Sequence, residues 1–278
     1  MSEAKYRNRD WLENKMKNKT LTKIAEECDV TTACISKWKR KFDLGSDKMI
    51  ACPTCDKKFI SIGNHWNYNP KHRPEISQRQ KEIITGVLMG DGCINREEKK
   101  NPRLQVYMTN KKYLNYLSNE FKIFSTGVYE HLLNEDRKHL APGSENKENY
   151  SDVYRFETRG HPGFEEFANW YSSGKKVFPE NIKLTPTVLK HWYVCDGSID
   201  HGKANPNIVI SCGNEINFKN KLQNIFQKSG FEISNFLCRE RSGGASGMSM
   251  TLQFTVDMSR KMFEYMGEPL PGFEYKWP

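Results

Sequence analysis

The 278-residue chain has no apolar run that approaches the roughly 20 residues needed to cross a membrane. Its first residues, Met-Ser-Glu-Ala, lack the pattern of a secretory signal, and its ends lack the Cys or Ser start and the His-Asn end of an intein. Mean hydropathy is −0.78, which suits a globular protein with ample polar surface. We therefore expect an intracellular protein, cytoplasmic or associated with the nucleoid, without a membrane partner.

The spacing of the cysteines offers no disulfide framework. The eight cysteines stand singly except for the pair Cys52 and Cys55, which favours a reducing compartment and metal binding. His65 and His72 follow, and two thiolates with two imidazoles complete a tetrahedral zinc shell. We expect one structural Zn²⁺ on these four residues, although the spacing departs from that of common zinc fingers. The alternative is a reduced cysteine pair with surface histidines.

We expect this zinc-binding knuckle, residues 46–76, to act as a structural clip between its neighbours, with a small DNA-contacting finger as the second choice. Lys57 and Lys58 would favour the thiolate forms of the cysteines. Positive charge is in excess over the first 80 residues. Residues 1–80 hold 17 Lys and Arg against 10 Asp and Glu, whereas the rest holds 26 against 24, within a net charge of +9. Attraction to a polyanion is therefore concentrated near the N-terminus.

Residues 1–45 have the pattern of a helix-turn-helix domain. Apolar spacing predicts one helix over 10–18, a second over 22–28 with Thr22 as its N-cap, and a third that begins at 31 or 32. The alternative is a small helical bundle with a solvated basic face. The third helix exposes residues that suit the major groove of DNA. These candidate DNA contacts are Ser36, Lys37, Lys39, Arg40 and Lys41.

Two apolar segments, 83–92 and 189–197, each end in Asp-Gly, which is typical of a short helix with an aspartate at its C-terminal end. An anion is unfavourable there, and two such helices side by side would raise the pKa of one or both carboxylates. A divalent cation between Asp91 and Asp196 would remove both costs. Gly86 and Gly90, one helical turn apart, leave a strip where another backbone can approach closely.

From about residue 78 to its end the chain consists of one unit that occurs twice. The two Asp-Gly pairs lie 105 residues apart and two Asn-Pro pairs lie 104 apart, with strands and amphipathic helices following in the same order. Each half, 77–180 and 181–278, therefore reads α-β-β-α-β-β-α. Coincidence of two unrelated segments is the alternative, and the matching order of elements argues against it.

These segments resemble the LAGLIDADG homing endonucleases. The first copy reads I-T-G-V-L-M-G-D-G, and the second, L-K-H-W-Y-V-C-D-G, is similar to the Trp-containing second motif of single-chain members. The resemblance implies an α+β fold in which a pseudo-twofold pair of halves forms a DNA-binding saddle. His191 and Cys195 stand where the first copy has glycines, so we expect a looser helix contact there.

The resemblance also implies site residues. Two or three Mg²⁺ ions would lie on Asp91 and Asp196, with the carbonyl groups of Gly90 and Cys195 as helpers. The family has a polar residue that positions water at the end of the second strand, and this position corresponds to Asn110 in the first half and to Asn214 or Glu215 in the second. The family also has a basic residue near the end of the fourth strand, which corresponds to Arg159 in the first half and falls near Asp257, with Arg260 close by, in the second. Lys276 lies in a matching C-terminal Tyr-Lys motif. DNA contacts would come from the strands and the loops 134–150 and 239–248, with these candidates: Arg103, Gln105, Arg239 and Arg241.

Three classes of function compete. The first is a sequence-specific endonuclease that cuts both strands of a long, partly asymmetric DNA site, acts as a monomer and carries an appended helix-turn-helix and zinc module. The second is a transcription regulator on the same scaffold, which would not need both aspartates. The third is an RNA-splicing maturase, with RNA as its partner. We expect the first.

Overall fold

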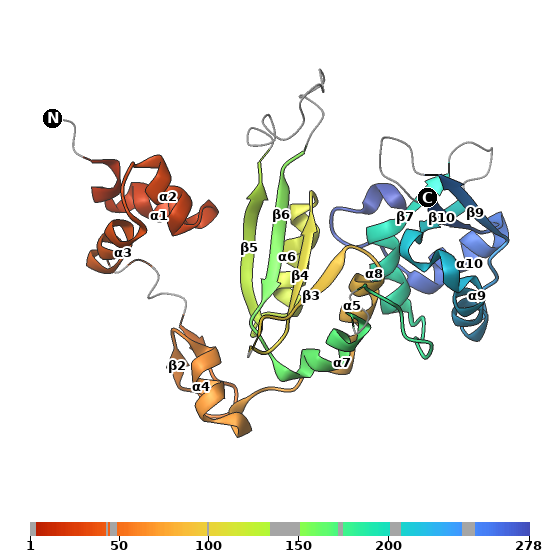
Figure 1. Ribbon diagram of the computed structural model, residues 1–278, viewed down its shortest axis with the longest axis horizontal. Helices are drawn as coiled ribbons and strands as arrows, with labels where there is room; N and C mark the ends of the chain where they lie inside the picture. The colour runs from red at the N-terminus through yellow and green to blue at the C-terminus, as the bar shows by residue number, and fades with distance from the viewer. Residues whose placement is uncertain are drawn as a thin grey trace, which may run out of the picture. The chain divides into compact units, whose positions relative to one another are not determined.

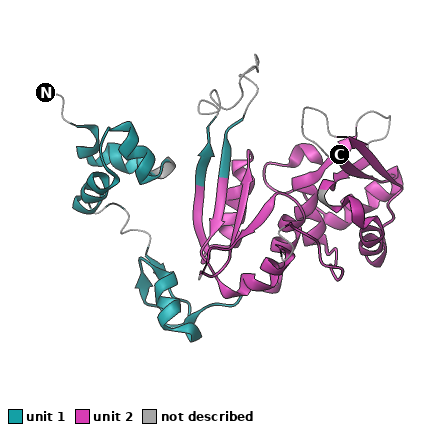
Figure 2. Ribbon diagram, viewed as in Figure 1, with its two compact units in different colours: residues 1–75, 129–154 teal, residues 76–128, 155–278 magenta. Residues whose placement is uncertain are grey.

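The computed structural model describes residues 4–42, 44, 49–98, 100–133, 151–171, 175–200, 207–240 and 248–278. The chain divides into two compact units (Figure 2). Unit 1 contains Met1–Glu75 and Tyr129–Tyr154, and unit 2 contains Ile76–Val128 and Arg155–Pro278. Within the described ranges, no helix has both the length and the apolar character that a membrane crossing requires.

The first part of unit 1 is a three-helix fold, as predicted. A short 3₁₀ turn, η1, precedes the helices, and their N-caps are Asn8, Thr20 and Thr31, each of which accepts a backbone hydrogen bond at the helix start. The prediction of Thr22 as the second N-cap is wrong by two residues. The elements are η1 (Lys5–Arg7), α1 (Arg9–Asn18), α2 (Leu21–Glu27) and α3 (Thr32–Lys41). The core residues are Leu12, Ile24, Ala25, Ile35 and Leu44.

The second part of unit 1 is a hairpin followed by a short helix. Strand β1 (Ile50–Ala51) pairs antiparallel with β2 (Lys58–Phe59), and α4 (Ile62–Tyr68) and η3 (Pro70–His72) follow. Helix α4 buries Ile62 and Trp66. The order is therefore β-β-α, with the Cys52–Cys55 pair in the turn between the strands.

The first half of unit 2 has a helix, two strands, a helix and two strands, followed by a broken helical segment. The sheet order is β3-β4-β6-β5. Leu104, Val106 and Phe156 are fully buried on one face of this sheet. The helix expected at the end of this half is instead divided into three short pieces. The elements are α5 (Gln78–Met89), β3 (Gly92–Asn95), β4 (Arg103–Met108), α6 (Lys111–Glu120), β5 (Ser125–Leu132), β6 (Val153–Thr158), η6 (Pro162–Phe164), α7 (Glu165–Ala168) and η7 (Asn169–Tyr171).

The second half repeats this order. Its sheet order, β7-β8-β10-β9, matches that of the first half position by position, so the predicted duplication and the α+β fold are confirmed (Figure 1). Ile208, Ile210 and Leu252 are fully buried on one face. The elements are α8 (Pro186–Asp196), β7 (Gly197–Asp200), β8 (Asn207–Ser211), η8 (Gly213–Phe218), α9 (Lys219–Lys228), β9 (Asn235–Glu240), β10 (Met248–Gln253), α10 (Val256–Met266) and η9 (Glu274–Lys276).

Candidate active site and nucleic-acid interface

Helices α5 and α8 pack directly against each other in unit 2. A Cβ atom on Gly86 would lie 2.4 Å from the carbonyl oxygen of Val188, and one on Gly90 would lie 2.3 Å from the Cβ of Cys195. Both distances are far below van der Waals contact, so only glycine permits this approach. The side-chain-free strip predicted from Gly86 and Gly90 is therefore where the two helices meet.

The expectation of a looser contact at His191 and Cys195 is wrong. The glycines of α5 lie opposite these two side chains and leave the space that they occupy. His191 is buried, and its Nδ1 lies 2.6 Å from the hydroxyl oxygen of Tyr113 on α6 of the first half. Burial lowers the pKa of His191 to about 3, so the buried ring is neutral, and the tautomer of that neutral ring sets which of the two groups donates the hydrogen bond. This buried hydrogen bond joins the two halves.

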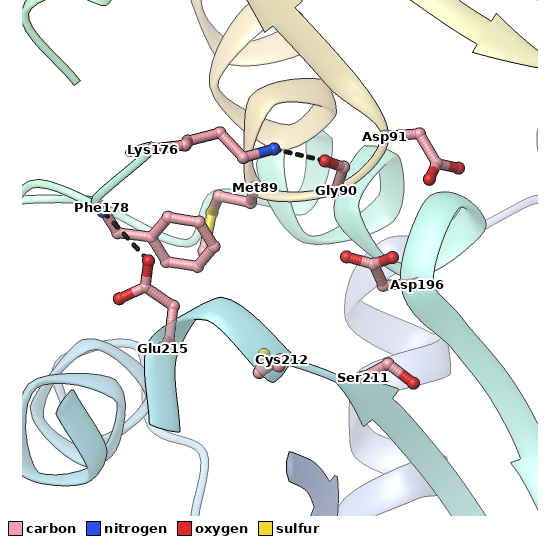
Figure 3. A pocket seen from close by; sticks show the side chains of 10 residues that line it. Met89, Gly90, Asp91, Lys176, Phe178, Asp196, Ser211, Cys212 and Glu215 are labelled. Carbon is pink, nitrogen blue, oxygen red and sulfur yellow. Dashed lines mark hydrogen bonds between the residues drawn. The ribbon is translucent and has the colours of Figure 1, made fainter. Parts of the chain in front are cut away.

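Asp91 and Asp196 line one pocket of about 230 Å³, together with Lys176 and Glu215 (Figure 3). Burial, helped by the Asp91 carboxylate, raises the pKa of Asp196 to about 7. The protein around Asp91 raises the pKa of its carboxyl as well, although this side chain keeps solvent exposure. Ionising both groups without a cation is therefore unfavourable, as their positions at the ends of two adjacent helices predict.

A lysine lies at the C-terminal end of each motif helix. Lys176 Nζ donates to the carbonyl oxygen of Gly90 at 2.6 Å, and Lys276 Nζ donates to that of Gly197 at 2.6 Å. These carbonyl groups carry the partial negative charge of a helix end, which cations stabilise. Burial lowers the pKa of both lysines, and the two aspartates oppose that shift. Each half thus contributes one aspartate and one lysine to the site.

Lys276 was a candidate from the sequence, whereas Lys176 was missed. A signal was present, because Lys176 is followed by Val-Phe-Pro and Lys276, 100 residues later, by Trp-Pro. Lys176 lies near the end of the first half, as Lys276 lies near the end of the second. A repeat that includes both ends pairs the two lysines.

The donors around the aspartates fit a hard divalent cation. Carboxylate oxygens are ligands that Mg²⁺ prefers, and a cation there would offset the unfavourable pairing of negative charges. The carbonyl oxygen of Gly90, which the sequence predicts as a metal ligand, already accepts a hydrogen bond from Lys176. Lys176 would therefore compete with a metal ion for this oxygen. Burial raises the pKa of the Cys195 thiol, which leaves its backbone carbonyl as the only hard donor of that residue.

Two of the predicted auxiliary residues serve the fold. Asn110 caps α6 through Tyr113 N at 3.1 Å and donates to the carbonyl of Gly272 at 2.6 Å. Arg159 donates to the carbonyl of Ser125 at the start of β5. Neither residue lines the pocket around the aspartates. Asn110 therefore contacts backbone groups of both halves, and Arg159 contacts backbone of the first half.

In the second half, Glu215 lies in the pocket wall, and the side chain of Asn214 is outside the described part of the chain. Glu215 is buried, accepts a hydrogen bond from Phe178 N at 3.3 Å and lies 3.6 Å from Lys221 Nζ. Burial raises the pKa of its carboxyl. Asp257 and Arg260 form an exposed ion pair on α10, at 3.3 Å, and do not line this pocket.

The sheet of the first half has an ion-paired polar face. Alternation along β4 puts Arg103 and Gln105 on the face opposite the buried Leu104. Glu157 accepts from Arg103 Nε at 2.9 Å and from Gln105 Nε2 at 3.1 Å, and Arg155 Nη2 lies 3.4 Å from its other oxygen. Gln105 is only 4% exposed, so its predicted contact with DNA bases is not available in this arrangement.

The corresponding face of the second half is mostly uncharged. The described residues that alternate away from the buried positions include Asn207, Ser211, Thr251 and Gln253, and Asn235 donates to Gln253 at 2.8 Å. Arg239 on β9 is exposed and lies opposite Ser249 on β10. The predicted candidate Arg241 and the loop 134–150 lie outside the described residues.

The basic residues of α3 lie away from the core of the three-helix fold. Lys37, Arg40 and Lys41 are exposed, while Ser36 and Lys39 are half-buried. Lys41 Nζ lies 4.2 Å from the centre of the Trp38 ring. Among the residues that the structure describes, none of these cations forms an ion pair, in contrast to Lys15 and Lys19, which pair with Glu27.

The four predicted zinc ligands come together. One potential ligand atom from each of Cys52, Cys55, His65 and His72 lies within 4.8 Å of the others. Burial opposes ionisation of the Cys52 thiol, but hydrogen bonds from the backbone of Thr54 and Cys55 outweigh it and lower the pKa. The donor types and their grouping fit Zn²⁺.

Comparison with known proteins gives relatives of this fold. The homing endonuclease I-WcaI, solved bound to its DNA recognition sequence, has a TM-score of 0.59 at 18% identity, over 76% of this chain and 90% of that chain. I-DmoI, solved in complex with DNA and Mn, has a TM-score of 0.39 at 11% identity, over 68% of this chain and 97% of that chain.

One curated relative is an uncharacterized protein, MJ1098, of Methanocaldococcus jannaschii. It is 30% identical over 131 residues, which are 46% of this chain and 47% of the relative, so the match spans about half of each protein. The sequence profile of the LAGLIDADG DNA endonuclease family matches residues 81–257, which contain both Asp-Gly motifs and both sheets. With a duplicated αββαββ order and two motif helices in direct contact, the chain belongs to the LAGLIDADG DNA endonuclease family.

Proposed function

We propose that the protein is a divalent-metal-dependent endonuclease that hydrolyses both strands of a specific duplex DNA site. The observation that carries this proposal is the shared pocket of Asp91 and Asp196, each at the end of a motif helix and each near a lysine that caps that helix end. Two carboxyl groups held together at adjacent helix ends are unfavourable for the fold by itself. A bound divalent cation would offset that cost and would use both carboxylates as ligands.

Asp91 and Asp196 are proposed to hold Mg²⁺, one carboxylate from each half. When bound, the metal supplies charge neutralisation at the phosphate and lowers the pKa of water. Glu215, buried in the same pocket, is placed to orient a water molecule on the side of the second half. Lys176 and Lys276 are placed to stabilise the negative charge that develops on the scissile phosphates.

Duplex DNA is the proposed partner, bound along the open faces of the two sheets. I-WcaI, which shares this fold, was solved with its DNA recognition sequence. Helix α3 of unit 1 is proposed to enter a major groove, because Lys37, Arg40 and Lys41 are exposed and lie opposite the core residue Ile35. Cys52, Cys55, His65 and His72 are proposed to hold one Zn²⁺.

The presence of both aspartates and both lysines favours a nuclease over a regulator on the same scaffold, which would need none of the four. The test is selection of cleaved molecules from a pool of randomised duplex DNA, with the zinc-loaded full chain and Mg²⁺. We expect recovery of a long, partly asymmetric site cut on both strands, and no cleavage without Mg²⁺. Binding of a long duplex that is never nicked, or activity only on structured RNA, would contradict the proposal.

A further inference from the structure

The zinc-binding knuckle, which the structure describes from residue 49 to residue 76, has an exposed helix face that a purely structural role does not require. Its order, β1-β2-α4 with two cysteines in the hairpin turn and His65 on the helix, is that of a zinc finger that reads DNA. The second histidine, His72, follows the helix on η3 and still reaches the cluster. The shorter loop and wider histidine spacing therefore leave the β-β-α arrangement intact.

Helix α4 separates its two faces cleanly. Ile62 and Trp66 are at most 1% exposed, and His65 points to the metal cluster, with its ring stacked on Phe59 at 3.9 Å between centroids. The opposite face carries only side chains that are exposed. These are Ser61, directly before the helix, and Asn64, Asn67 and Tyr68.

These outer residues occupy the positions from which β-β-α fingers contact bases. Such fingers use residues −1, 3 and 6 relative to the start of the helix. With Ile62 as the first residue of α4, those positions are Ser61, Asn64 and Asn67. Asparagine pairs with adenine through two hydrogen bonds in the major groove, and serine accepts or donates to any base. Within the described part of the chain, Asn67 Oδ1 accepts a competing hydrogen bond from Arg73 Nη2, and this contact is long, at 3.5 Å.

The surroundings of this face also suit duplex DNA. Ile60 is 71% exposed and Tyr68 is 86% exposed, so both side chains are open to contact with a partner. Lys57, Lys58 and Lys71 are exposed on the same module and would contact phosphates. A DNA groove covers both kinds of side chain at once, whereas open solvent leaves Ile60 and Tyr68 without contacts.

We infer that the zinc-binding knuckle is a base-reading finger, in which Ser61, Asn64 and Asn67 contact about three successive base pairs of duplex DNA, with adenine preferred opposite the asparagines. This inference rests on the proposed function only in taking duplex DNA as the substrate. It makes the knuckle part of sequence recognition, in place of the structural clip expected from the sequence.

The experiment compares bound sequences selected from randomised duplex DNA by the zinc-loaded full chain, without Mg²⁺, so that the result does not depend on cleavage. The test variant is Asn64→Ala with Asn67→Ala. Its matched control is Asn115→Ala with Asn119→Ala, two exposed asparagines on α6. We expect the test variant to lose preference at one block of about three base pairs and to bind the selected site about ten-fold more weakly, with the control unchanged.

A second variant guards against a folding defect. Asn64→Arg is expected to change the preferred base at one position from adenine to guanine, a gain that misfolding cannot produce. Zinc content is measured for every variant. Full retention of the sequence motif in both variants would overturn the inference and leave a structural clip. An equal loss for all sequences, or binding of RNA in preference to duplex DNA, would overturn it as well. Cleavage by unit 2 at its selected site would survive any of these results.

Discussion

In the first half, α5 presents Gly86 and Gly90 to its partner helix, and in the second half α8 presents His191 and Cys195 at the matching places. The two helices are therefore not alike, yet they pack closely because the side chains of one occupy the space that the glycines of the other leave. Glycine is needed on only one side of such a contact. This explains how the second motif departs from the first without separating the two aspartates.

The sheets differ as well. The open face of the first half carries Arg103 and Arg155 around the nearly buried Glu157, whereas the described face of the second half carries mainly uncharged side chains, together with Asp200 and the exposed Arg239. Fixed, ion-paired side chains present one hydrogen-bonding pattern, and small polar side chains adapt to several. The two halves are therefore alike in the aspartates and lysines at the ends of their motif helices and different on their sheet faces.

The largest expected effect comes from filling the space on α5. Gly86→Ala puts a Cβ atom 2.4 Å from the Val188 carbonyl oxygen, on backbone that cannot move aside easily. We expect a loss of about 3 kcal/mol or more and a fall in Tm of roughly 10 °C, measured by calorimetry of the full chain. The control, Gly63→Ala, meets nothing within 4 Å and should be neutral or slightly stabilising. Equal effects of the two substitutions would refute the close contact.

The second prediction distinguishes the two aspartates by how stability depends on pH. Because the pKa of Asp196 is raised from 3.8 to about 7 in the folded protein, the native state keeps a proton that the unfolded state has released between these values. Stability of the metal-free protein therefore falls as pH rises from about 4 to about 7. We expect Asp196→Asn to raise Tm at pH 8 by several degrees, at about 2–4 °C per kcal/mol, and to leave Tm unchanged at pH 4.

The comparison variant for that measurement is Asp91→Asn, for which we expect a smaller gain, because Asp91 is the more exposed of the two. Thermal unfolding in Mg²⁺-free buffer from pH 4 to pH 8 gives both curves. A larger gain for Asp91→Asn, or a difference that does not vary with pH, would show that the two carboxylates are not distinguished as the pocket geometry implies.

A smaller effect tests the sheet faces. Glu157→Gln removes one of the two carboxylates that pair with Arg103, the other being Glu97, and should reduce base discrimination in the half-site bound by the first half, by about ten-fold at one or two base pairs. Gln253→Ala, on the second sheet, should alter only the other half-site. Sequence profiling of bound duplexes measures both. Changes spread evenly over the whole site would argue against separate reading by the two halves.

The smallest effect concerns Arg159. Since it bonds to backbone carbonyl groups at the start of β5, Arg159→Lys should lower the free energy of unfolding by about 1 kcal/mol and leave the cleavage rate unchanged. Lys276→Met, which removes a positive charge that interacts with both aspartates, should lower the rate. Single-turnover cleavage and urea unfolding separate the two outcomes. A rate defect in Arg159→Lys comparable to that of Lys276→Met would restore the catalytic role inferred from the sequence.

The sequence was sufficient where signals are local and repeated. The Asp-Gly ends of the motif helices, the order of strands and the zinc ligands all follow from short patterns, and the structure brings the predicted residues together. What the sequence did not reveal depends on packing. Lys176 donates to the Gly90 carbonyl, 86 residues away in sequence. Gln105 is buried through its hydrogen bond to Glu157, and Asn110 donates to the distant Gly272. No local pattern encodes contacts across so many residues.

The central claim is that Asp91 and Asp196 act together on a bound metal. Its most direct test is strand-resolved cleavage of the selected duplex with Mg²⁺ by the wild type, Asp91→Asn and Asp196→Asn, alongside DNA affinity. Metal catalysis contributes several kcal/mol, so we predict a loss of about a thousand-fold in rate for either variant with affinity nearly unchanged. Cleavage of both strands at the wild-type rate by either variant would contradict the account.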